Sequence, residues 1–129
     1  MKLLQSLFLL TVITVITSTS LFAQKGNKRS AKDIAKKQTE WMIKDLSLDT
    51  TQAEKVATIN LNFTNSMFSA REKNMGNREA MQTEMKTLRK KKDTELKKVL
   101  SEEQFKLYKK KLAEMRAQRN GNRGGGGMR

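Results

Sequence analysis

Positive charge is the most prominent chemistry of this sequence. The chain of 129 residues carries 27 lysines and arginines and a formal net charge of +14. Many of them lie in short clusters, namely Arg89–Lys92, Lys97-Lys98, Lys106 and Lys109–Lys111. Such a surface attracts acidic partners over roughly 8–10 Å at physiological salt. The alternative is a solvated helix face that only keeps the protein soluble.

Methionine supplies a second kind of chemistry, because flexible thioethers adapt to many apolar shapes. Met67, Met81, Met85 and Met115 match the spacing of a helical core, so ordinary packing is the simpler explanation for them. The helix that carries Met67 has a second apolar stripe, which lies on a different face from the residues with core spacing. It predicts a dimer seam, a client surface or the margin of a wide core. The expected client or partner surface comprises Leu61, Phe68, Met75, Arg89, Lys90, Lys91 and Lys92.

Residues for catalysis are missing. The chain has no histidine and no cysteine, which excludes Cys–His pairs, Ser–His–Asp triads and the usual zinc ligand sets. The closest acidic pairs, Glu102-Glu103 and Asp93 with Glu95, do not face each other on a helix. We therefore expect no enzyme, no metal site and no cofactor.

Two short motifs must position the helices that carry these side chains. Leu48–Gln52 and Leu100–Gln104 each read leucine, capping residue, two spacers and glutamine. The capping side chain can accept a hydrogen bond from the glutamine N–H, and the glutamine side chain can reach back to the cap N–H. Each leucine then stands outside its helix as a hydrophobic staple. The helix-capping residues are Leu48, Asp49, Gln52, Leu100, Ser101 and Gln104.

The apolar spacing predicts an all-α fold with four helices. They are expected over residues 31–46, 50–74, 78–99 and 102–119. Each motif opens the second helix of a pair, so we expect an elongated arrangement of two helical hairpins. Lys92 intrudes on the apolar face of the third helix and must snorkel or lie at its margin.

The ends of the chain differ in composition from this helical domain, residues 30–119. Residues 1–23 have the pattern of a secretory signal peptide, with an uncleaved membrane anchor as the alternative. Residues 24–29 predict a flexible leader, and the Gly/Arg-rich residues 120–129 predict a disordered tail. An exported chain without cysteine has no disulfide staple, which makes dimerisation the expected route to extra stability.

Together, the paired leucine–glutamine motifs, the signal peptide and the basic helical pattern resemble the Spy/CpxP family of periplasmic proteins with the LTxxQ motif. Asp49 and Ser101 stand where that motif has threonine, and either residue can cap a helix. The resemblance implies an antiparallel, cradle-shaped homodimer with a basic concave face. It also implies an ATP-independent chaperone or an envelope-stress regulator. Metal sensing by histidine or cysteine does not carry over.

The leading functional hypothesis is a periplasmic holdase that binds unfolded or acidic proteins. The alternative is a regulatory partner of an envelope-stress sensor kinase without general chaperone activity. A further hypothesis is adhesion to an anionic envelope polymer. The export signal argues against nucleic acid as a partner, as does the scarcity of aromatic residues for stacking.

Overall fold

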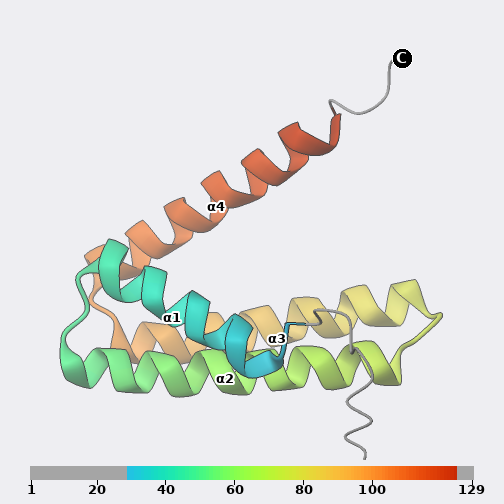
Figure 1. The fold of residues 1–129 in the computed structure, drawn as a ribbon, viewed down its shortest axis with the longest axis horizontal. Helices are drawn as coiled ribbons and strands as arrows, with labels where there is room; N and C mark the ends of the chain where they lie inside the picture. Colours follow the sequence, from blue (N-terminus) through green and yellow to red (C-terminus); the bar gives the residue numbers. More distant parts are fainter. Residues whose placement is uncertain (1–28, 125–129) are drawn as a thin grey trace, which may run out of the picture.

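The computed structural model describes residues 29–124, which form four α-helices and no strand (Figure 1). The fold class is therefore all-α, as predicted. The helices are α1 (Ala31–Leu46), α2 (Thr50–Lys73), α3 (Arg78–Val99) and α4 (Glu102–Gly124). The predicted signal peptide lies outside the described residues, as do residues 24–28 of the leader and 125–129 of the tail.

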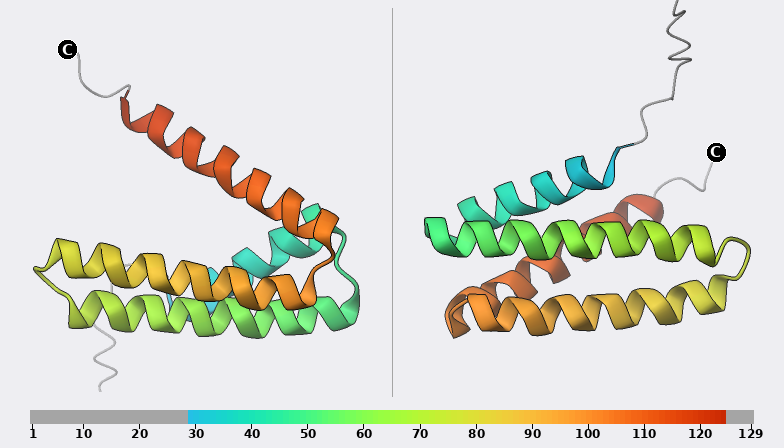
Figure 2. Two further views of the ribbon diagram at one scale, coloured as in Figure 1. Left: turned by 180° about the vertical axis from the view of Figure 1, so that it is seen from behind. Right: turned by 90° about the horizontal axis from the view of Figure 1, so that it is seen from below.

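The four helices do not form two matched hairpins. α2 and α3 lie antiparallel, α1 packs along α2, and α4 diverges from the other three (Figures 1 and 2). α4 approaches α1 and α3 only near its first turns. The expected α3–α4 hairpin is therefore wrong: α3 already packs on α2, and the first turns of α4 pack on α1 instead. The Trp41 and Tyr108 rings stack there, with centroids 6.2 Å apart.

The predicted helix boundaries agree closely with the structure, except at the C-terminal end. α1 and α3 have the expected bounds, and α2 ends one residue early, at Lys73. A turn follows in which Gly76 has φ +87°, a conformation that glycine adopts without strain. α4 continues to Gly124, past the expected end near residue 119. The helix passes Gly121 because a single glycine costs only about 1 kcal/mol relative to alanine.

Both predicted capping boxes are present. Asp49 Oδ1 accepts from Gln52 N at 2.7 Å, and Gln52 Oε1 accepts from Asp49 N at 3.2 Å. Ser101 Oγ accepts from Gln104 N at 3.2 Å, and Gln104 Oε1 accepts from Ser101 N at 3.0 Å. These bonds satisfy N–H groups that a helix N-terminus leaves unpaired, so they fix where α2 and α4 begin.

The two glutamines also bind each other, which the sequence did not predict. Gln52 Nε2 donates to Gln104 Oε1 at 2.7 Å, and Gln104 Nε2 donates to Gln52 Oε1 at 3.2 Å. Gln52 Nε2 further donates to Val99 O, and Gln104 Nε2 to Leu46 O, each at 3.1 Å. One amide pair therefore joins the C-terminal ends of α1 and α3 to the N-terminal ends of α2 and α4.

The buried core lies beside this amide pair. It comprises Met42, Leu46, Val56, Leu96, Leu100 and Tyr108. Leu48 and Phe105 pack against it from the two corners. Farther along α2, the polar residues Asn60 and Thr64 are fully buried. Asn60 Nδ2 donates to Thr39 Oγ1 of α1 at 3.0 Å, so a polar contact sets how α1 lies on α2.

We predict that Gln52→Glu destabilises the protein far more than the loss of a helix cap would. Glutamate serves well in a capping box, but it has no N–H to donate to Val99 O or Gln104 Oε1. The variant should lower the free energy of unfolding by about 2–3 kcal/mol. Urea denaturation followed by far-UV circular dichroism measures this change.

The matched control is Gln82→Glu, the same substitution at an exposed position of α3. It should change the free energy of unfolding by no more than about 0.5 kcal/mol. Equal stability of the two variants would show that the amide pair does not hold the helix ends together.

Candidate functional site

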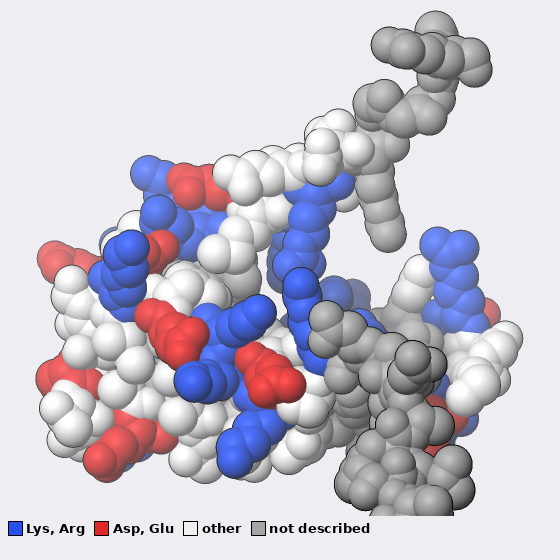
Figure 3. Space-filling view, viewed as in Figure 1, with Lys and Arg blue, Asp and Glu red and all other residues white. Residues whose placement is uncertain are grey.

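The basic groove lies between α4 and the other three helices and has a volume of about 280 Å³. Figure 3 shows lysine and arginine side chains gathered where α4 stands away from the body of the molecule. The groove is lined by Gln38, Trp41, Phe63, Met67, Arg71, Met85, Arg89, Lys92, Asp93, Tyr108, Leu112, Met115, Arg116 and Arg119. All four helices contribute, so the groove exists only because the corner holds α4 at this angle.

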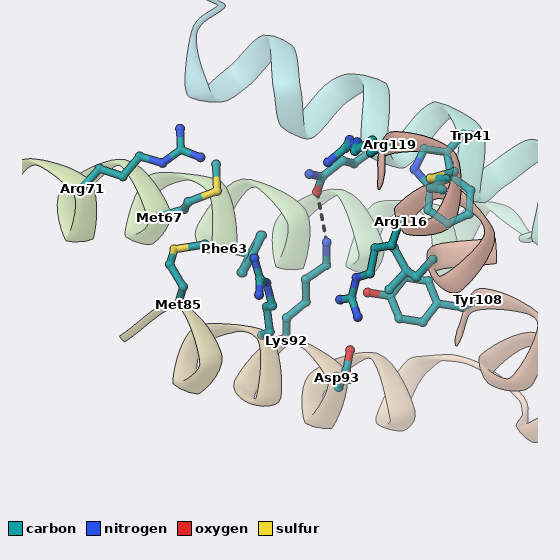
Figure 4. A pocket seen from close by; sticks show the side chains of 14 residues that line it. Trp41, Phe63, Met67, Arg71, Met85, Lys92, Asp93, Tyr108, Arg116 and Arg119 are labelled. Atoms are coloured by element: carbon teal, nitrogen blue, oxygen red, sulfur yellow. Dashed lines mark hydrogen bonds between the residues drawn. The ribbon is translucent and has the colours of Figure 1, made fainter. Parts of the chain in front are cut away.

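Apolar side chains from each helix line much of the groove. Trp41 comes from α1, Phe63 and Met67 from α2, and Met85 from α3 (Figure 4). Met115 comes from α4. Three of these five are methionines, whose unbranched thioethers adapt to ligands of different shape. The surface can therefore accept apolar groups without requiring one fixed geometry.

Cationic side chains surround this apolar lining. Arg71, Arg89, Arg116 and Arg119 line the groove together with Lys92. Asp93 is the single acidic residue among the lining residues, and it is already paired with Lys109 Nζ at 2.6 Å. The described groove thus has an excess of positive charge beside apolar surface, the combination that suits an amphipathic anion.

Lys92 is the least exposed of these cations, at 9% of its surface. Its Nζ donates to Gln38 Oε1 at 3.0 Å and lies 4.7 Å from the centre of the Phe63 ring (Figure 4). No carboxylate among residues 29–124 forms an ion pair with it. Burial therefore lowers the pKa of Lys92 from 10.5 to about 8, since the charged form loses its hydration.

Tyr108 closes the groove at the base of α4. Its ring is buried and contacts Trp41 and Phe105, with centroid distances of 6.2 and 5.9 Å. Burial, and then the negative charge of Asp93, raise the pKa of the Tyr108 hydroxyl above its ordinary value. A second ion pair, between Lys111 Nζ and Asp45 Oδ2 at 3.7 Å, links this end of α4 to α1.

The structure does not bring the predicted client surface together. Leu61, Phe68 and Met75 are 37%, 36% and 82% exposed and are not among the residues that line the basic groove. Lys90 and Lys91 are exposed outside the groove, and Lys91 lines a separate pocket with Leu88 and Phe63. Lys92 is buried, so it does not belong to an exposed cluster. Of the seven predicted residues, only Arg89 and Lys92 line the basic groove.

A repeated sequence signal could have located the groove. Met67 precedes Arg71, Met85 precedes Arg89 and Met115 precedes Arg119, each by four residues. Residues four apart share one face of a helix, and all six residues line the groove. Each of α2, α3 and α4 thus presents one methionine and one arginine to the same space.

Neither clustered metal ligands nor a membrane span is found in the part of the chain that the structure describes. Residues 29–124 contain no group of acidic residues that could hold a metal ion. None of the helices in this part combines the length and apolar character that a bilayer span requires.

A family model described as a domain of unknown function, DUF4890, matches residues 23–108. The chain belongs to this family. The DUF4890 match contains both capping boxes, and it ends before Met115 and Arg119 on the outer half of α4. No curated protein and no solved structure matches the chain. The resemblance to the Spy/CpxP family stays a prediction.

We predict that the stability of this DUF4890 protein rises with pH between about pH 8 and 9.5. In that window Lys92 loses its proton in the folded state, whereas in the unfolded chain it stays charged because its pKa is ordinary. The unfolded state then binds more protons, so the free energy of unfolding increases, by about 2 kcal/mol at most. Above about pH 10, Tyr108, the one tyrosine of the chain, ionises in the unfolded state but keeps its proton in the folded state, because burial raises its pKa. This lowers the free energy of unfolding and works in the opposite direction.

Urea denaturation at pH 7, 8, 9 and 9.5 measures this change, and Lys92→Met is the comparison. The variant should be at least as stable as the natural protein at pH 7, because it removes a buried charge, and its stability should not rise over this window. A rise of equal size in both proteins would assign the effect to other groups.

Proposed function

We propose that this protein is an exported, ATP-independent chaperone that holds unfolded proteins in the basic groove. The proposal rests on one observation: methionines and arginines from three helices line the same open groove. Apolar side chains of a client would contact the methionine-rich lining, and its acidic groups would pair with the arginines. The client backbone would stay in water outside the groove.

Weak binding suits this role. Without ATP hydrolysis, release must follow from low affinity, and micromolar dissociation constants, which correspond to binding free energies of about −8 kcal/mol, are sufficient. Long-range charge attraction speeds the encounter, and adaptable methionines tolerate many sequences. The signal peptide pattern and the resemblance to the Spy/CpxP family support a periplasmic location.

The exposed apolar stripe on α2 supports a homodimer as part of this proposal. Leu61 and Phe68 of α2 are partly exposed, and Met75 in the turn after α2 is largely exposed. A second copy of the chain, packed antiparallel against this stripe, would bury it and leave both basic grooves open. The resemblance to the Spy/CpxP family suggests a cradle-shaped dimer of this kind.

We predict that charge reversal inside the groove weakens chaperone activity strongly, whereas the same reversal outside it does not. Arg71→Glu with Arg116→Glu should raise the protein concentration needed to suppress client aggregation by about tenfold, a loss of ~1.4 kcal/mol in binding. Light scattering of an aggregating acidic client, at low and at moderate salt, measures suppression.

Lys90→Glu with Lys91→Glu is the matched control, because it changes the net charge equally on exposed positions outside the groove. It should reduce suppression by less than twofold at moderate salt, and circular dichroism verifies that both variants are helical. If the natural protein fails to suppress aggregation at equimolar concentration, the chaperone proposal is wrong. Binding of one saturable partner without general clients would favour the regulator of an envelope-stress sensor.

A further inference from the structure

Lys92 occupies an unusual position for a cation. Its side chain is nine-tenths buried, its hydrogen-bond partner is the neutral Gln38, and no carboxylate in residues 29–124 forms an ion pair with it. A buried charge without an opposite charge is costly, and a carboxylate placed beside it removes much of that cost. The neighbouring Asp93 offsets this cost only in part: its charge raises the pKa of Lys92 by less than burial lowers it, and its carboxylate is paired with Lys109.

The lining around Lys92 favours an alkyl chain over a polypeptide backbone. All walls of the groove are helices, whose backbone groups are already paired within the helix. The lining offers few acceptors for peptide N–H groups, and of these Gln38 Oε1 already accepts from Lys92 and Asp93 Oδ2 from Lys109. An unpaired buried N–H costs about 1–3 kcal/mol, whereas an alkyl chain has no polar group to satisfy.

The volume of the groove indicates the length of such a chain. At about 30 Å³ for each methylene-sized group, close to the share of one water molecule in the liquid, 280 Å³ holds roughly nine or ten groups. Trp41, Phe63 and three methionines would contact the chain, and Arg116 and Arg119 would add positive charge from α4.

We propose that the basic groove binds a free medium-chain carboxylate, a single-chain fatty acid of about ten carbons, with its carboxylate on Lys92 Nζ. The carboxylate accepts a charge-assisted hydrogen bond from the ammonium group. The alkyl chain lies along the methionine and aromatic side chains between α4 and the body of the molecule. This activity uses the same groove as the chaperone proposal but does not depend on it.

Isothermal titration calorimetry with decanoate, below its micelle concentration and at 150 mM NaCl, tests the proposal. We expect saturable one-to-one binding and a change in the fluorescence of Trp41, the one tryptophan of the chain. Decyltrimethylammonium, which has the opposite charge, should bind at least tenfold more weakly. Decanol should bind more weakly than decanoate as well, since it carries no charge.

Two lysine variants locate the carboxylate. Lys92→Met keeps an apolar side chain of similar length and should weaken decanoate binding at least tenfold, with little change for decanol. Lys91→Met removes the adjacent lysine, which does not line the groove, and should change decanoate binding by less than twofold. Arg116→Gln, an exposed position on α4, should weaken binding severalfold and serves if Lys92→Met does not fold.

Several results would overturn the proposal. The first is the absence of saturable decanoate binding. The second is binding of decyltrimethylammonium as tight as that of decanoate. The third is an equal loss of decanoate affinity in Lys91→Met and Lys92→Met. Binding to phosphatidylglycerol vesicles without binding of free decanoate would identify a membrane surface as the partner instead. Suppression of aggregation is measured separately, so failure here leaves the chaperone proposal standing.

Discussion

The amide pair between Gln52 and Gln104 is the interaction on which the rest of the structure depends. Each glutamine uses its oxygen for the capping box of its own helix and for the other glutamine, and uses its nitrogen for that glutamine and a helix-end carbonyl. Both amides are thereby fully hydrogen-bonded with no charge involved. The pair fixes two corners at once, so the direction in which α4 leaves the core is set where the helix begins.

The groove is a consequence of that corner. α4 is held at its base by the Trp41–Tyr108 stack and by ion pairs from Lys109 and Lys111, while its outer half has few contacts with the body of the molecule. A helix fixed at one end encloses a wedge-shaped space beside its neighbours. The methionines and arginines of α2, α3 and α4 line that space. The position of the candidate site therefore follows from local hydrogen bonding at the corner, far from Arg71 and Arg119.

Sequence reasoning located the helices well because their boundaries depend on local signals. Asp49, Ser101 and Gly76 each act within a few residues, and the helices begin and end accordingly. The pairing of Gln52 with Gln104 joins residues far apart in the chain, so no local pattern indicates it. The burial of Asn60 likewise depends on Thr39 of another helix. The α3–α4 hairpin was wrongly expected because helix spacing gives an apolar face but not the neighbour that covers it.

Electrostatics explains why the groove stays open as well as what it attracts. Arg116 and Arg119 on α4 face a space that also receives Arg71, Arg89 and Lys92 from α2 and α3, and a single carboxylate that is already paired. These cations line the same groove, so their repulsion opposes closer packing of α4 on the body. An anion in the groove offsets the same repulsion. The charges that prevent an apolar lining from closing on itself are therefore the ones that select for a ligand carrying negative charge.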